Sequence, residues 1–171
     1  MDLLSHLEKL LAHYKVEQLN EDNCQGYFSV FESNAQYWED TQGSPATKQD
    51  CLVTVCYCPD NFDRRKVRCI GISECETPVA VVSLLEDYPD TGVLYLGLLL
   101  VDGEMQRKGI GTEIVDAIVK ASQGMFDTIQ LSVGQNNTGA LRFWEKQGFV
   151  IDEVSFYRET DNLPLMLTLD S

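Results

Sequence analysis

The sequence predicts an α/β domain on a mixed sheet, antiparallel early in the chain and closed by one late parallel crossover. Apolar and alternating runs indicate three successive strands at 67–74, 79–86 and 93–101, which should form an antiparallel meander. An amphipathic helix that begins near Ile110 leads to a half-buried strand at 128–133. Because a helix joins the last two strands, we expect them to be parallel.

Composition indicates one globular domain with an acidic surface. The 171 residues are 44% hydrophobic, and no linker or internal repeat divides the range 1–171. The formal net charge of -14 comes from 27 Asp plus Glu against 13 Lys plus Arg. Such a chain repels polyanions, so we expect no nucleic-acid partner. The acidity favours a cationic acceptor, although acidic surfaces also serve solubility.

Neither a targeting segment nor a metal-binding pattern is evident. The N-terminus lacks the basic region of a secretory signal, and no apolar run approaches the ~20 residues that span a bilayer. We therefore expect a cytoplasmic protein without membrane association. The six cysteines form no C-x-x-C pair, and His6 and His13 lie two turns apart on a predicted helix. Free thiols and no metal site are expected.

The first 40 residues are expected to be mainly helical, whereas 41–66 is the least readable part of the chain. Leucines at three- and four-residue steps predict an amphipathic helix over 2–13. A short strand at 16–19 follows, and then an aromatic-rich helical stretch over 21–40 with a break near 33–34. The apolar run 52–57 lies between two loop signals and is left unassigned.

The C-terminal third is expected to hold two helices and a hairpin. The first helix presents a buried face from Ile110 to Met125. Residues 136–138 can cap a short second helix, and Gly148-Phe149 combines a helix stop with an apolar anchor. The third predicted meander strand, 93–101, is apolar on both faces and should lie centrally. The final hairpin is predicted at 150–158 and 165–169.

The loop between strand 93–101 and the following helix is the most informative stretch. Two glycines, Gly109 and Gly111, let the backbone approach a ligand closely. The free N–H groups of the helix's first turn, with the positive end of its dipole, suit a pyrophosphate. Arg107 and Lys108 add positive charge to an otherwise acidic chain. The alternative is an ordinary strand-to-helix loop whose glycines allow tight turning.

Two other phosphate-binding motifs do not fit these letters. A Walker loop needs G-x-x-x-x-G-K-S/T, but Gly103 is followed at that interval by Lys108-Gly109 in reversed order. A dinucleotide fingerprint needs a third glycine where this chain has Ile114. Both motifs are therefore excluded.

The loop instead resembles the acetyl-CoA loop of GNAT acetyltransferases, Q/R-x-x-G-x-G/A, at every defined position from Gln106 to Gly111. A second signature of that superfamily, N-x-x-A, an aromatic residue and then G-F, is similar to residues 137–149. The resemblance covers about 67–158. It implies a GNAT-like fold in which strands 93–101 and 128–133 splay apart around a thioester.

That resemblance implies an N-acetyltransferase that uses acetyl-CoA as cosubstrate and needs no metal. Backbone N–H groups over 107–112 would hold the pyrophosphate, and the main chain of the central strand's end would contact the pantetheine arm and acetyl group. An amine would attack the thioester directly in a ternary complex. The implied cofactor-binding residues are Leu99, Val101, Gln106, Arg107, Lys108, Gly109, Ile110, Gly111, Thr112, Asn137 and Trp144.

Two positions depart from the family's catalytic pattern. Trp144 stands where family members often have a tyrosine that protonates the departing thiolate. Water, Tyr157 or unassisted departure of the thiolate would have to replace that step. Tyr95 stands where several relatives have a glutamate base.

The role of Tyr95 has two interpretations. We expect Tyr95 to share a strand face with Leu99 and Val101, to line the acceptor pocket and to relay a proton through water. The alternative is a strand aromatic packed in the core. Glu86 and Asp87, at the preceding turn, are further candidates for the base.

The leading hypothesis is an N-acetyltransferase whose acceptor is a small-molecule or peptide amine, with polyamines, aminoglycosides and basic peptides as cationic candidates. A second hypothesis is a catalytically silent acyl-CoA-binding regulatory module, suggested by Trp144 and the missing base. A third is an interaction protein that docks through its N-terminal helix. In the family, acceptor choice resides in regions that correspond to 20–60 and 155–165, and homodimers are common.

Overall fold

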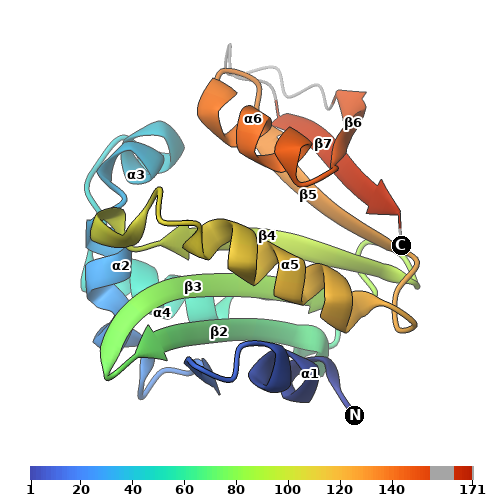
Figure 1. Ribbon diagram of the computed structural model, residues 1–171. Helices are drawn as coiled ribbons and strands as arrows, with labels where there is room; N and C mark the ends of the chain where they lie inside the picture. The colour runs from blue at the N-terminus through green and yellow to red at the C-terminus, as the bar shows by residue number, and fades with distance from the viewer. Residues whose placement is uncertain (155–163, 171) are drawn as a thin grey trace.

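The protein is built on a seven-stranded mixed sheet with helices on both faces (Figure 1). The structure, a computed structural model, describes residues 1–154 and 164–170. The strand order is β1-β2-β3-β4-β5-β7-β6. Within the described ranges, no helix is both long enough and apolar enough to cross a membrane. The strands are β1 (Lys15–Gln18), β2 (Val67–Glu74), β3 (Thr77–Glu86), β4 (Val93–Val101), β5 (Thr128–Gly134), β6 (Val150–Val154) and β7 (Pro164–Asp170). The helices are α1 (Leu3–Leu10), α2 (Phe28–Glu32), α3 (Ala35–Gln42), α4 (Lys48–Cys56), α5 (Ile110–Ser122) and α6 (Thr138–Lys146), with 3-10 turns at η1 (Cys24–Tyr27), η2 (Arg64–Lys66) and η3 (Gly103–Met105).

The predicted meander and crossover are both confirmed. Strands β2, β3 and β4 pair antiparallel in sequence order, and β5 pairs parallel to β4 after the α5 crossover. The strand predicted at 79–86 begins two residues earlier, at Thr77. β4 is the middle strand of the sheet, as its uniformly apolar sequence indicated.

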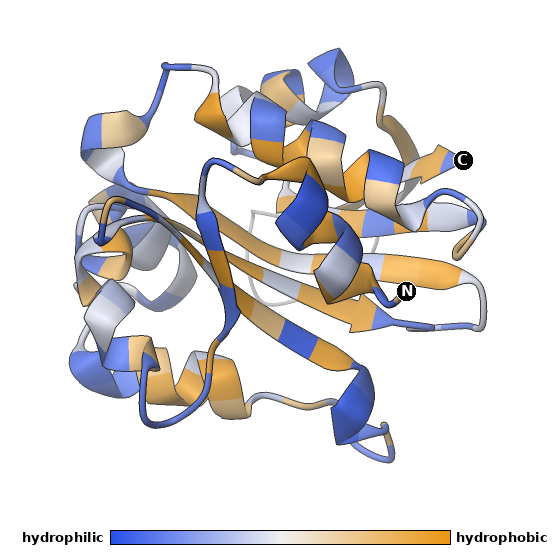
Figure 2. Cartoon of the chain, turned by 60° about the horizontal axis from the view of Figure 1, so that its bottom comes forward, coloured by the Kyte–Doolittle hydropathy of each residue, from blue (hydrophilic) through white to orange (hydrophobic). Residues whose placement is uncertain are grey.

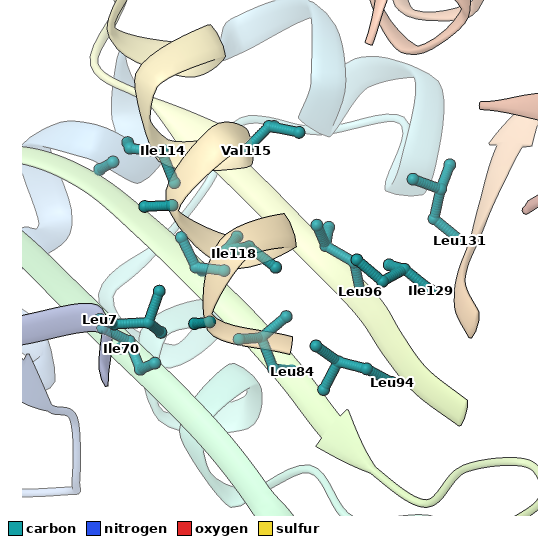
Figure 3. Close-up of a cluster of buried hydrophobic side chains, with 14 of the residues drawn as sticks. Leu7, Ile70, Leu84, Leu94, Leu96, Ile114, Val115, Ile118, Ile129 and Leu131 are labelled. Atoms are coloured by element: carbon teal, nitrogen blue, oxygen red, sulfur yellow. The ribbon is translucent and has the colours of Figure 1, made fainter. Parts of the chain in front are cut away.

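One apolar layer joins α1 and α5 to the sheet. Ile114 and Ile118 of α5 are almost fully buried with Leu7 of α1 and with Leu84 and Leu94 of the sheet. Figure 3 shows these side chains gathered between the helix and the strands. Figure 2 shows apolar residues concentrated on the central strands and on the helix faces turned toward them. This layer holds α5 firmly across β4, so the start of α5 has a defined position.

A second apolar layer covers the opposite face of the sheet with η1, α2, α3 and α4. Phe31 stacks on Trp38 at 5.7 Å between ring centroids, and Trp38 Nε1 donates to the Phe31 carbonyl at 2.8 Å. The predicted helical stretch 21–40 is broken at Ser33 and Asn34, as expected. The unassigned run 52–57 is the end of α4 and its C-cap.

The buried face predicted for α5 is one turn too long. The helix ends at Ser122, and Met125 lies beyond it with 36% of its surface exposed. Gln123 leaves the helical conformation, and Gly124 adopts a φ of 78° that bends the chain toward β5. The expectation that Met125 belongs to the core is therefore wrong.

The C-terminal elements follow the prediction in type and order. Asn137 caps α6, Gly148 turns the chain with a φ of 97°, and Phe149 is buried. Strands β6 and β7 form an antiparallel hairpin whose second strand lies beside β5. Tyr157 falls at 155–163, outside the described residues.

Shortening Ile118 to alanine tests the α5 layer. The side chain is 1% exposed between α5 and the sheet, so its loss leaves a cavity and should lower the unfolding free energy by about 2 to 5 kcal/mol. Urea denaturation followed by circular dichroism measures this change. Leu10→Ala is the control, since Leu10 is 43% exposed and should cost less than about 1 kcal/mol. Equal losses in both variants would contradict the assigned packing.

Candidate active site

The two central parallel strands separate soon after they meet. β4 and β5 pair only at Val93–Thr128, Leu94–Ile129 and Tyr95–Gln130. Figure 1 shows β5 diverging from β4 beyond this point. A cleft of about 890 Å³ lies there, lined by both strands and by residues of α3 and α6. The splayed central strands expected from the resemblance are thus confirmed.

A β-bulge at Gly97 reverses the side-chain alternation of β4. The register against β3 shifts there, so Gly97 is an extra residue. Beyond it, Leu99 and Val101 pack with the α5 layer. Tyr95 and Leu98 instead line a cleft on the α3 and α4 side. The expectation that Tyr95 shares a face with Leu99 and Val101 is therefore wrong, because simple alternation does not continue through a bulge.

Ladder geometry directs the main chain of Leu99 toward the gap. Asp102 N donates to Val79 O at 2.7 Å, which makes these two residues a hydrogen-bonded pair. Such pairs alternate with non-hydrogen-bonded ones in an antiparallel ladder, so the N–H and C=O groups of Val101 and Leu99 point away from β3. They face the side from which β5 has diverged.

Two amide side chains secure the end of β4. Gln106 Nε2 donates to Val101 O at 3.0 Å and to Asn34 Oδ1 at 2.9 Å. Asn34 Nδ2 donates to Val101 O at 2.9 Å and to Val30 O at 2.8 Å. The side chain of Gln106, expected among the cofactor-binding residues, thus anchors the loop. Sequence reasoning missed Asn34, although the helix break at this position was a signal.

The loop before α5 has a backbone conformation that favours glycine. Gly109 is the N-cap of α5 with a φ of 82°, while a Cβ there would meet no atom within 4 Å. Conformation rather than space therefore favours glycine. Arg107 also has a positive φ, 65°, and both Arg107 and Lys108 are exposed. The first turn of α5, including Ile110 and Thr112, follows directly, so its free N–H groups and positive dipole end face the same loop.

Gly111 and Thr112 also link α5 to α6. A Cβ on Gly111 would lie 3.4 Å from Phe143 Cζ, so this glycine permits close helix packing. Thr112 Oγ1 accepts a hydrogen bond from Gln147 Nε2 at 3.3 Å. These contacts hold α6, which carries the second signature, against the start of α5, which carries the first.

Asn137 and Trp144 both line the first cleft from the α6 side. Asn137 Oδ1 accepts from Ala140 N at 3.1 Å and so caps α6. Trp144 is 7% exposed and packs edge-on against Phe149, with ring centroids 5.2 Å apart. The cleft wall here is an aromatic ring without a hydroxyl, and an indole N–H is not a usable acid.

A second cleft of about 730 Å³ opens on the α3 and α4 side. Both clefts are lined by Gly97, Leu98 and Ser132 of the strands and by Tyr37 and Thr41 of α3, so the two meet beside α3 where β4 and β5 part. At that junction Tyr95 Oη and Ser132 Oγ share a hydrogen bond of 2.9 Å across the gap. The Tyr95 ring also packs edge-on against Tyr88 at 5.5 Å.

The two candidate turn carboxylates are engaged elsewhere and line neither cleft. Asp87 accepts from Gly92 N at 2.9 Å and from Lys66 Nζ at 2.9 Å. The Gly92 hydrogen bond and then the Lys66 contact lower the pKa of Asp87. Glu86 pairs with Arg68 Nε at 2.8 Å. Both carboxylates stabilise the β2–β4 end of the sheet.

The splayed sheet, the strand-to-helix loop and the α6 contact define an acetyltransferase-type domain. The profile of the acetyltransferase (GNAT) family matches residues 27–149. The chain belongs to this family.

Individual relatives agree with this assignment. N-alpha-acetyltransferase 30 of Xenopus laevis is 40% identical over 63 residues, which span 36% of this chain and 23% of the relative. An acetyltransferase structure from Thermus thermophilus has a TM-score of 0.77 at 16% identity, covering 92% of this chain and 97% of that one. The PaiA N-acetyltransferase of Thermoplasma acidophilum, solved in complex with coenzyme A, has a TM-score of 0.64 at 16% identity, covering 92% and 99%. At these identities the structures show a shared fold.

Gln106→Glu tests the anchor at the end of β4. The variant keeps the shape of the side chain but replaces its donor group by an acceptor facing Val101 O and Asn34 Oδ1. We expect the unfolding free energy to fall by about 1 to 3 kcal/mol in urea titrations. Gln25→Glu, at an exposed glutamine, is the matched control and should change little. An unchanged Gln106→Glu protein would refute the anchoring role.

Proposed function

We propose that this protein is an acetyl-CoA-dependent N-acetyltransferase that acts on an amine of a small molecule or peptide. The observation that carries the proposal is the junction of two clefts at the point where β4 and β5 part. Both clefts reach α3, but only the first is also lined by α6 and only the second by α4. A cosubstrate in the first cleft and an acceptor in the second could therefore meet where the two clefts join.

The residues around the first cleft suit acetyl-CoA. The N–H groups of 107–112, the α5 dipole and the charges of Arg107 and Lys108 would hold the pyrophosphate. The pantetheine arm would run along the main chain of β4, where Leu99 faces the gap. Asn137 and Trp144 would form the opposite wall. When bound, acetyl-CoA supplies the thioester carbonyl that the amine attacks.

Chemistry at the junction needs a proton acceptor and a donor to the thioester oxygen. A primary amine has a pKa near ~10 and must lose a proton before it attacks. The Leu99 N–H is directed at the gap and would donate to the oxygen as negative charge develops on it. Tyr95, bonded to Ser132, would relay the amine's proton through water. With Trp144 at the usual acid position, protonation of the departing thiolate is assigned to water or Tyr157.

Several observations support the proposed acceptor and setting. The similarity to N-alpha-acetyltransferase 30 of Xenopus laevis supports a peptide α-amine as one acceptor class. Direct attack in a ternary complex is supported by the two clefts that meet at one point. The net charge of -14 disfavours nucleic acid as a partner. We place the reaction in the cytoplasm, and a homodimer is compatible with the proposal.

A catalytically silent acyl-CoA-binding module is the second candidate function. The indole of Trp144 at the usual acid position and the absence of a carboxylate from the described lining of the second cleft favour it. Such a module would bind acetyl-CoA without acetylating amines. Turnover with a panel of amines separates the two functions.

Gly109→Asp should weaken cofactor binding. Aspartate tolerates a positive φ, and a Cβ at this position meets no atom within 4 Å, so the fold should survive. Its carboxylate would stand where the pyrophosphate binds and should weaken acetyl-CoA by at least about tenfold through like-charge repulsion. Isothermal titration measures the affinity. Gly109→Asn is the control, since it has the same shape without the charge, and equal loss in both variants would argue against a pyrophosphate site.

Tyr95→Phe should lower kcat by about ten- to a hundredfold while leaving KM for acetyl-CoA nearly unchanged. The variant keeps the ring packing on Tyr88 and removes only the hydroxyl that would relay the proton. Ser132→Ala is the companion variant, because it breaks the same hydrogen bond but leaves the Tyr95 hydroxyl in place. If Tyr95→Phe retains full activity, Tyr95 has no part in the proton transfer.

A further inference from the structure

The described lining of the second cleft is uncharged and aromatic in a strongly acidic protein. None of its described lining residues is Asp, Glu, Lys or Arg, although the chain carries 27 acidic residues and a net charge of -14. Five aromatic side chains contribute to its walls. They are Tyr37, Trp38, Tyr57, Tyr88 and Tyr95.

Three exposed apolar side chains cluster around this opening. Val53 is 58% exposed, Tyr57 54% and Tyr37 36%, and all three line the cleft. They are three of the eight large hydrophobic side chains that are exposed in the described part of the chain. Clustered exposed apolar side chains mark a surface that is covered by a ligand or partner.

Ring contacts hold much of the cleft wall in place. Tyr37 packs edge-on against Trp38 at 5.1 Å, and Trp38 is fixed by its hydrogen bond to the Phe31 carbonyl. On the other side, Tyr88 lies edge-on against Tyr95 at 5.5 Å and against Phe62 at 5.3 Å. A preformed apolar wall loses little conformational entropy when it binds an apolar group.

Nearby carboxylates are positioned for other contacts. Glu86 and Asp87 pair with Arg68 and Lys66 at the end of the sheet. Asp40 lines the first cleft rather than the second, and its Oδ1 accepts from Gln36 Nε2 at 2.8 Å. A second ammonium group in the aromatic cleft would lose its water without gaining a carboxylate partner from the described lining. A cation–π contact of about 0.5 to 2 kcal/mol would offset only part of that cost.

We infer that the acceptor carries a large apolar or aromatic group beside its amine and no second positive charge. This inference rests on the proposed function, because it assigns the second cleft to the acceptor. The reacting amine would reach the junction at Gly97 and Ser132, while its apolar neighbour would occupy the space between α3, α4 and Tyr88. The overall acidity of the chain, which favours a cationic acceptor, does not extend to this cleft.

Paired amine probes test the inference in both binding and turnover. Phenethylamine and spermidine are titrated calorimetrically into the protein, with and without coenzyme A, and each is then assayed for acetylation. We expect phenethylamine to bind at least about tenfold more tightly, because its ring is buried in the cleft. Tripeptides that begin with phenylalanine or lysine form a second pair and show whether the apolar amine is free or at a peptide N-terminus.

Val53→Glu should weaken the preference for phenethylamine. Val53 is exposed on α4, so the variant should fold, and its carboxylate would lie at the cleft where a cation could pair with it. The ratio of phenethylamine to spermidine affinity should fall about tenfold. Val150→Glu makes the same change at a 61% exposed position on β6 that lines neither cleft, and the ratio should stay as in the unsubstituted protein.

The outcomes separate this inference from the proposed function. Tighter binding of spermidine, equal binding of both amines, or binding of neither would overturn the apolar acceptor class. An equal change of the ratio in Val53→Glu and Val150→Glu would do the same. Failure of the protein to bind acetyl-CoA would instead refute the proposed function. The titrations without coenzyme A would still show whether the second cleft prefers an apolar amine to a polyamine.

Discussion

The early separation of β4 from β5 is the constraint around which the site is built. A sheet strand that loses its neighbour exposes main-chain groups that need other partners. At the end of β4, the carbonyl of Val101 receives hydrogen bonds from Gln106 and Asn34. Earlier along the same strand, the main chain of Leu99 is left facing the gap. The same separation therefore accounts for the anchored loop and for the place where a thioester would bind.

The bulge at Gly97 changes which side chains of β4 lie on each face of the sheet. Because the alternation reverses there, Leu99 and Val101 join the α5 layer, while Tyr95 and Leu98 face α3 and α4. A strand that follows strict alternation would place Tyr95 on the α5 side, away from the second cleft. The bulge thus lets a single strand contribute side chains to the α5 layer and to the second cleft.

Bulk charge and local charge differ in this protein. The net charge of -14 describes a solvated surface, and exposed charges act over only about 8 to 10 Å at physiological salt. Two basic residues, Arg107 and Lys108, stand at the start of α5, and the second cleft has an uncharged described lining. Composition therefore predicts that polyanionic partners are excluded, but it does not predict the chemistry of an individual cleft.

Local patterns in the sequence determined the meander, the α5 crossover and the 106–111 loop, because periodicity, glycine conformation and helix starts depend on residues close in the chain. The weakly patterned α4 was unassigned, and Met125 was placed in the core one turn too far along. Only the tertiary structure decided that Tyr95 faces α3 and α4, since the bulge that turns it arises from pairing with β3. Only the tertiary structure, likewise, brought Asn34 to Val101 across 67 residues of sequence. These contacts join distant segments, and no local pattern encodes which distant segments will meet.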